Sequence, residues 1–192
     1  MELAKKQDIY TYEDYASWPE NERWQILDGV PYMQATPTSK HQKVSGELFL
    51  QIGNYLKGKT CDVYSAPFGV RLPEKNKKKD KDILNVVEPD ISVICDKSKI
   101  DEKGCLGAPD LVIEILSPSS VKLDKIIKFK KYEKAGVKEY WVVDIENRIV
   151  EVYRLQGKSK FGKIDIYSEE DKVKVSIFDD LQIDLAEVFK EV

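Results

Sequence analysis

The chain has 192 residues, of which 42% are hydrophobic and 34% are charged, so it can bury a core and is neither disordered nor collagen-like. Its 31 basic and 34 acidic residues give a formal net charge of -3, so the overall charge does not by itself indicate a nucleic-acid partner. Domains commonly have about 100–150 residues, and we therefore expect one domain over residues 1–192, with its core at about 10–189.

The apolar runs, the cysteines and the single histidine bear on location and chemistry. The sequence shows no apolar run long enough for a signal peptide or a membrane span, so we expect no membrane association. Cys61, Cys95 and Cys105 form no CxxC pair and their odd number leaves at least one thiol unpaired, so a cytoplasmic location is the simplest expectation. His41 is the only histidine of the sequence, which disfavours a zinc site or a histidine-based catalytic triad.

The first half of the chain is expected to contain a short helix, a hairpin, a long helix and two strands. The hairpin is indicated by Asp28-Gly29, a turn sequence between two apolar runs. The long helix is indicated by apolar residues at every fourth position from Val44 to Leu56. The lysine-rich stretch 74–82 lacks apolar periodicity and is predicted to be a solvated loop. In chain order, the predicted elements are the helix 11–17, the strands 24–27 and 30–33, the helix 39–57, and the strands 61–72 and 86–94.

The second half is expected to alternate buried strands with one helix. Residues 110–116 form a nearly continuous apolar run, which is typical of a strand covered on both faces by helices. A helix over 119–135 is predicted to end at Gly136. The remaining predicted elements are the strands 137–144, 149–155, 163–167 and 172–177 and a final helical turn at 184–189. This order predicts an α/β or α+β domain with a mixed sheet.

Two acidic residues stand in apolar strands. Asp90 lies within the predicted strand 86–94, and Glu114 lies within the predicted strand 110–116. Carboxylates are seldom buried without a compensating charge or hydrogen bonds, so one divalent metal shared by both acids would account for the pair. For either acid alone, an edge position facing water or a buried salt bridge is the more ordinary explanation.

The predicted helix after Glu114 supplies cations close to these acids. Asp124, Lys128 and Tyr132 recur at steps of four and share one helix face. Residues 119–138 contain seven lysines and two acids, a local net charge of +5. A lysine beside a metal-bound phosphate can stabilise the negative charge that develops there, and we assign that role to Lys128. For most of the other lysines, an exposed helix face is the simpler interpretation.

These residues resemble the signature of a nuclease superfamily. Pro89-Asp90, followed after 23 residues by Glu114, is similar to the PD-(D/E)XK pattern of restriction-endonuclease-like nucleases. Longer strings are more specific, and in their order along the chain they resemble the bacterial Uma-two family of endonucleases over about residues 12–189. Those strings are Asp28-Gly29, His41, Glu88-Pro89-Asp90, 109–119, Asp124, Lys128, Tyr132 and 139–144.

The resemblance implies a fold, a cofactor and a reaction. The fold is an α/β (α+β) restriction-endonuclease-like domain with a mixed β-sheet, an αβββαβ core flanked by helices, and extra strands towards both termini. The reaction is Mg²⁺- or Mn²⁺-dependent hydrolysis of phosphodiester bonds in DNA, with Asp90, Glu114 and the backbone carbonyl of Ile115 as metal ligands. Lys128 matches the catalytic lysine, which the superfamily signature places two residues after the second acid, where this chain has Leu116.

Further site residues follow from the same resemblance. His41 matches a histidine near the start of the first long helix, where it would orient water or support the metal site; a helix-capping or packing histidine is the alternative. Relatives often carry glutamate at the position of Gln25, and glutamine offers only a neutral carbonyl oxygen, so weaker metal binding or an inactive site is expected. Gln25, Asp124 and Tyr132 are expected to position the metal or the substrate.

Two other functions fit the same residues. A nucleic-acid-binding module that keeps the fold without the chemistry would bind DNA with a steep salt dependence and need no metal. A structural or protein-interaction domain, with Asp90 and Glu114 paired to lysines, would bind neither DNA nor metal. Cleavage of both strands of a duplex would suit a homodimer, although no residue of the sequence indicates one.

Overall fold

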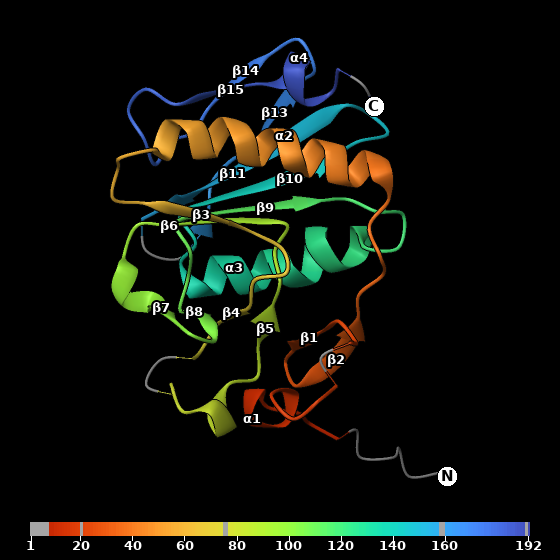
Figure 1. The fold of residues 1–192 in the computed structure, drawn as a ribbon, viewed down its shortest axis with the longest axis vertical. Coiled ribbons are helices and arrows are strands. Elements are labelled where there is room, and N and C mark those ends of the chain that lie inside the picture. The colour runs from red at the N-terminus through yellow and green to blue at the C-terminus, as the bar shows by residue number, and fades with distance from the viewer. Residues whose placement is uncertain (1–7, 20, 75–76, 158–159, 191) are drawn as a thin grey trace.

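The computed structural model describes residues 8–19, 21–74, 77–157, 160–190 and 192. Runs of strands are separated by a few helices (Figure 1). The helical elements are α1 (Tyr12–Tyr15), α2 (Ser39–Leu56), α3 (Phe129–Ala135), α4 (Leu185–Val188), the 3-10 turns η1 (Asp80–Asp82) and η2 (Lys97–Lys99), and the π-helical segment η3 (Leu123–Lys128). The long helices predicted at 39–57 and 119–135 are therefore present, the second as η3 followed by α3.

The larger sheet contains the predicted core order. Its strands run in the order β12-β11-β10-β9-β6-β3, with β13 beside β11. In the described part of this sheet, only β9 and β10 are parallel neighbours, and the helical segment η3–α3 connects them. Along the chain, α2, β3, β6, β9, α3 and β10 give the expected αβββαβ succession. The strands are β3 (Asp62–Ser65), β6 (Ile91–Ile94), β9 (Leu111–Ile115), β10 (Glu139–Asp144), β11 (Ile149–Gln156), β12 (Lys160–Phe161) and β13 (Asp165–Ser168).

A second mixed sheet corrects the expectation of a single one. Its order is β2-β1-β5-β4-β8-β7, in which β4 and β8 are parallel. A separate antiparallel ribbon is formed by β14 and β15. These strands are β1 (Trp24–Leu27), β2 (Val30–Met33), β4 (Val70–Arg71), β5 (Val86–Val87), β7 (Ile100–Asp101), β8 (Gly104–Leu106), β14 (Lys172–Lys174) and β15 (Gln182–Asp184).

Helices cover both faces of the larger sheet (Figure 1). α2 packs on one face, and its apolar residues at steps of four from Val44 to Leu56 are all buried there against Ile113 and Trp141. α3 lies on the opposite face, where Tyr132 is buried with Val112. The near-continuous apolar run of β9 is explained by this arrangement, because every residue of the strand is buried from both sides.

Two predicted strands are each divided between the two sheets. The predicted strand 61–72 becomes β3 and β4, and the predicted strand 86–94 becomes β5 and β6. Each division falls at a proline, Pro67 in one case and Pro89 in the other, which cannot donate a ladder hydrogen bond. The short strands β7, β8, β12 and β15 were not predicted, because two or three residues carry no readable alternation.

The structure also shows how the three cysteines are arranged and where the lysine-rich stretch is described. A disulfide joins Cys61 to Cys95 at adjoining ends of β3 and β6, and Cys105 is a buried free thiol, so the expected unpaired cysteine is present. The cytoplasmic location expected from the sequence stays a prediction. No helix in the described parts of the chain is long and apolar enough to cross a membrane. Residues 75–76 of the predicted lysine-rich loop lie outside the described residues.

Candidate active site

The two acids predicted to bind a metal lie at the same end of the larger sheet. β6 and β9 are antiparallel neighbours in which Ile91 pairs with Ile113. Continuing this register by one residue sets Asp90 opposite Glu114, and directly opposed residues of an antiparallel pair project from the same face. Asp90 is half-buried and Glu114 is buried. The sheet therefore brings the two carboxyl groups together, as the sequence predicted.

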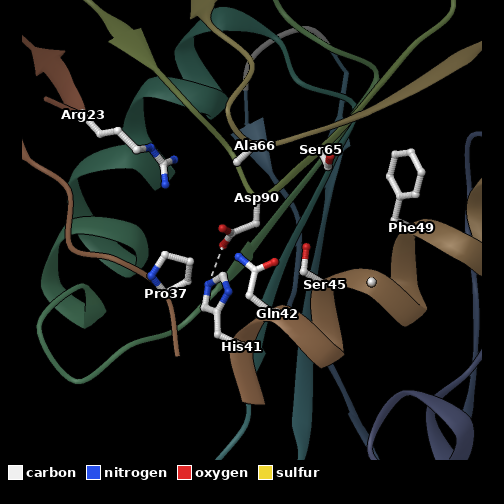
Figure 2. A pocket seen from close by; sticks show the side chains of 10 residues that line it. Arg23, Pro37, His41, Gln42, Ser45, Phe49, Ser65, Ala66 and Asp90 are labelled. Atoms are coloured by element: carbon white, nitrogen blue, oxygen red, sulfur yellow. Dashed lines mark ion pairs between the residues drawn. The ribbon is translucent and has the colours of Figure 1, made fainter. Parts of the chain in front are cut away.

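Asp90 is oriented by a backbone amide and faces His41 (Figure 2). The Ile115 N–H donates a hydrogen bond of 2.8 Å to Asp90 Oδ2, and His41 Nε2 lies 3.3 Å from the same oxygen. His41 stands in the first turn of α2, where its own N–H donates to the capping hydroxyl of Thr38. Burial lowers the pKa of His41, but the hydrogen bond to Asp90, the Asp90 charge and a hydrogen bond to the Ile115 backbone together outweigh it and leave this pKa above its ordinary value.

Glu114 is held from the opposite helix layer. Lys128 Nζ donates to Glu114 Oε1 over 2.9 Å, and the Tyr132 hydroxyl donates to the same oxygen over 2.5 Å. All three side chains are buried. Burial raises the pKa of Glu114 although the Lys128 ammonium opposes it. Burial would lower the pKa of Lys128, but the neighbouring carboxylates raise it above its ordinary value, so this lysine stays charged.

The π-helical segment η3 carries Asp124 and Lys128. The hydrogen bond that defines a π-helix runs from the N–H of Phe129 to the carbonyl oxygen of Asp124, five residues earlier. Asp124 Oδ1 lies 3.1 Å from Lys128 Nζ, so the ammonium stands between two carboxylates. The Tyr140 hydroxyl also donates to the Asp124 carbonyl, over 3.2 Å. π-helical turns inside α-helices are frequent at functional sites.

β1 and the residue before it add polar groups to the same region. Gln25 is 4% exposed, and its Oε1 has no hydrogen-bond partner in the part of the chain that the structure describes. Arg23 Nη2 donates to Glu88 Oε2 over 2.9 Å, and Gln34 Nε2 donates to that oxygen over 3.2 Å. The arginine is therefore neutralised by Glu88, whereas Gln25 keeps an unused buried acceptor.

A groove with a volume of about 970 Å³ contains these groups. Its walls include the segments 33–40, 115–124 and 144–147. The charged lining residues are Arg23, Lys40, Lys122 and Lys128 on the basic side and Glu88, Asp90, Glu114, Asp124, Asp144 and Glu146 on the acidic side. Six carboxylates against four basic groups disfavour a polyanion unless a bound cation offsets them.

The donor set at the base of the groove fits a hard divalent cation. Mg²⁺ and Mn²⁺ prefer oxygen ligands, which Asp90, Glu114, the Gln25 amide and the carbonyl of Ile115 can supply. The hydrogen bonds described above use one oxygen of each acid, Asp90 Oδ2 and Glu114 Oε1. Among the described residues, no group of three or more His, Cys, Asp or Glu is placed to hold a metal ion. A cation at this position would therefore be bound by two carboxylates, with neutral oxygens and water as its remaining ligands.

The lysines of the basic stretch 119–138 are largely paired with acids. Five of the seven lysines in 119–138 make ion pairs in the structure. Besides Lys128, the pairs are Lys125–Glu151, Lys131–Asp28, Lys134–Glu74 and Lys138–Asp110. The local charge of +5 is thus mostly offset by other elements, and a DNA partner stays a prediction.

Comparison with known proteins decides the family. Residues 12–186 match Uma2, described as "Putative restriction endonuclease". The chain belongs to the Uma2 family. A protein of Synechocystis sp., described as uncharacterized, is 26% identical over 144 residues, which are 73% of this chain and 72% of that protein. A crystal structure from Anabaena variabilis, described as a "putative nuclease belonging to DUF820", has a TM-score of 0.74 at 22% identity and covers 94% of this chain and 97% of its own.

This Uma2 chain also shows what the sequence did not reveal. The family resemblance is confirmed, and the fold is shared with the Anabaena structure. The Arg23–Glu88 pair beside the groove was not predicted, although Glu88 stands next to the Pro89-Asp90 motif and could have been considered. The π-helical bonding of η3 leaves no signal in residue spacing. Tyr132 is buried, so it contacts Glu114 and cannot stack on a base.

Proposed function

We propose that this Uma2 protein hydrolyses phosphodiester bonds of DNA with Mg²⁺ or Mn²⁺ at the Asp90–Glu114 end of the larger sheet. The observation that carries the proposal is the meeting of two carboxyl groups and a buried lysine in one groove with an acidic lining. Acids crowded in this way favour a bound cation, and the cation then makes the groove acceptable to phosphate. The family description supports the same reaction class.

The side chains have distinct roles in this proposal. Asp90, Glu114 and the Ile115 carbonyl would hold the cation, with the Gln25 oxygen close by. When bound, the cation would polarise a phosphoryl oxygen and lower the pKa of a water molecule. The Ile115 N–H and His41 fix the direction of the Asp90 carboxyl. Lys128, held by Glu114 and Asp124, places a positive charge where negative charge develops on the phosphate.

A DNA-binding role without chemistry is the second candidate, and it has its own support. Lys128 and Tyr132 already satisfy one oxygen of Glu114 without a metal. Gln25 offers only a neutral oxygen, which binds a divalent cation more weakly than a carboxylate. Under this alternative, DNA binds with steep salt dependence, and Mn²⁺ adds neither affinity nor cleavage.

The test measures cleavage and metal binding on the same proteins. Single- and double-stranded DNA are incubated with Mg²⁺ or Mn²⁺ and with the wild type, Asp90→Asn or Glu114→Gln. We expect cleavage to fall at least about 1000-fold in each variant, which corresponds to about 4 kcal/mol of transition-state stabilisation. Calorimetric titration with Mn²⁺ should show binding to the wild type and much weaker binding to both variants.

Asp110→Asn provides the matched control. Asp110 is also a buried acid beside β9, but it lies outside the groove, so this variant should retain cleavage and Mn²⁺ binding. Equal cleavage by the wild type and both site variants would overturn the proposal. DNA binding without any heat from Mn²⁺ would instead favour the second candidate.

A further inference from the structure

A second, smaller pocket adjoins the groove on the other side of His41 and Asp90 (Figure 2). Its volume is about 160 Å³. Arg23, Pro37, His41 and Asp90 line both the pocket and the groove, so the two hollows meet at the His41–Asp90 pair. Whatever occupies the pocket therefore lies directly beside the proposed reaction centre.

One face of α2 forms a wall of this pocket. Gln42, Ser45, Gly46 and Phe49 follow the i, i+3, i+4, i+7 pattern of a single helix face, and all four line the hollow. Ser65, at the end of β3, lines it from across the hollow (Figure 2). The wall thus combines an aromatic ring with an amide and two hydroxyl groups, which suits a flat ligand with polar edges.

The charges at the pocket disfavour an anion. Asp90 places a carboxylate at the boundary between the two hollows. The Arg23 guanidinium, also at this boundary, is already paired with Glu88 over 2.9 Å. A phosphate in the pocket would face the Asp90 carboxylate without a cation of its own, so an uncharged occupant is favoured.

We propose that this pocket binds the base of a nucleotide adjacent to the scissile phosphate. The proposal rests on the function proposed above and adds the conformation of the substrate. A single base fits the 160 Å³ hollow and a base pair does not, so the base enters from a single strand or after leaving the duplex stack. Phe49 contacts the face of the base, and Gln42 with the serine hydroxyls contacts its edge.

Gly46 offers a direct way to block the pocket. A Cβ at this position would meet no atom within 4 Å, and the residue is exposed in the middle of α2. Leucine favours a helix over glycine, so Gly46→Leu should fold while its side chain fills the hollow. Asn54→Leu is the matched control, because it adds an exposed leucine to the same helix outside the pocket.

The experiment uses the full chain and uncharged 2′-deoxynucleosides without metal. Titrations are followed through the backbone amide signals of ¹⁵N-labelled protein. We expect saturable shifts at Gly46 and Ser65 with nucleosides and none with deoxyribose 5-phosphate. Gly46→Leu should weaken nucleoside binding at least about tenfold, whereas Asn54→Leu should leave it within about twofold of the wild type. Gln42→Leu should reduce the differences in affinity among the four nucleosides.

The outcomes separate this inference from the proposed nuclease activity. Nucleoside binding that Gly46→Leu abolishes supports the pocket, even if no DNA is cleaved. Absence of saturable shifts at Gly46 overturns the pocket, even if the wild type cleaves DNA. Equal shifts with deoxyribose 5-phosphate, or unchanged binding by Gly46→Leu, would also overturn it.

Discussion

The two ends of the parallel strands β9 and β10 both carry buried acids, but the acids have different surroundings. At the starting end, Asp110 precedes β9 and Glu139 begins β10. At the finishing end, Glu114 stands on β9 next to Asp90. Asp110 and Glu139 line neither hollow described above, whereas Glu114 and Asp90 line the groove.

Each acid at the starting end accepts a hydrogen bond from a backbone amide, and Asp110 also pairs with the Lys138 side chain. Glu139 Oε1 accepts the indole N–H of Trp141 over 2.7 Å, and its Oε2 accepts the backbone N–H of Ser176 over 2.6 Å. Asp110 Oδ2 accepts the backbone N–H of Cys95 over 2.8 Å. These carboxylates join the sheet to the chain segments that cover its edge, which is a structural role.

The acids at the finishing end have side-chain partners and line the groove. Glu114 is bound by Lys128 and Tyr132, and Asp90 by His41 in addition to one backbone amide. Burial of a carboxylate therefore does not by itself mark a functional site in this fold. The groove distinguishes the two ends, in line with the tendency of ligands to bind at the carboxyl ends of parallel strands.

Removing Glu139 should have the largest effect on stability. Glu139→Ala leaves the Trp141 and Ser176 donors buried without an acceptor, and we expect the free energy of unfolding to fall by about 3–5 kcal/mol. Glu114→Gln should change it by only about 1 kcal/mol, because Lys128 keeps Asp124 as a partner. Urea denaturation measures both values. A larger loss for Glu114→Gln than for Glu139→Ala would reverse the comparison of the two ends.

Lys128→Met should separate chemistry from cation binding. Without the ammonium, we expect cleavage to fall about 100-fold, or about 2.7 kcal/mol. Mn²⁺ affinity should stay the same or increase, because a competing positive charge has left Glu114. The measurements are single-turnover cleavage and calorimetric titration with Mn²⁺. Loss of Mn²⁺ binding in this variant would contradict the division of roles between the lysine and the acids.

Gln25→Glu should strengthen the cation site. It places a carboxylate where Gln25 now has an unpartnered buried oxygen. We expect Mn²⁺ affinity to rise about tenfold, or about 1.4 kcal/mol, and the thermal midpoint to fall without metal and recover with it. Thermal unfolding with and without Mn²⁺ provides the measurement, with Asp110→Asn as a control in which Mn²⁺ should raise the midpoint only as much as in the wild type. An affinity equal to that of the wild type would exclude Gln25 from the site.

Tyr132→Phe should have the smallest effect. It removes one hydrogen bond to Glu114 and keeps the buried ring, so we expect a stability loss of about 1 kcal/mol. Cleavage should fall moderately, because the carboxyl group is less firmly oriented. Urea denaturation and cleavage rates, measured beside Tyr140→Phe, distinguish this effect from a general loss of a buried hydroxyl. Unchanged cleavage in Tyr132→Phe would show that its hydroxyl serves the fold alone.

Much of the fold could be predicted because its signals are local. The spacing from Val44 to Leu56 identified α2, and the apolar run at 110–116 identified β9 as a strand covered on both faces. The two sheets could not be separated in the sequence, because Pro67 and Pro89 indicate a break in the predicted strands 61–72 and 86–94 but not a change of sheet. Whether a proline bends a strand or divides it depends on the partners that tertiary structure supplies.

The site was predictable to the extent that it follows from neighbouring strands and a helix face. Asp90, Glu114 and Lys128 were expected together and are found together, although their catalytic roles stay predictions. The ion pair between Arg23 and Glu88 joins residues 65 positions apart in the sequence, and no local pattern predicts such a contact. The small pocket likewise depends on Ser65 and α2, which the sheet brings together.

The π-helical turn η3 makes the site depend on chain length as well as on residue type. In an α-helix each residue is rotated by about 100° around the helix axis from the one before it. Deleting one residue between Asp124 and Lys128 would therefore rotate these two side chains by that angle relative to each other. A continuous α-helix would then form more easily, yet one of the two side chains would leave the groove. Substitutions preserve this phase relation, whereas a single insertion or deletion in 123–128 destroys it.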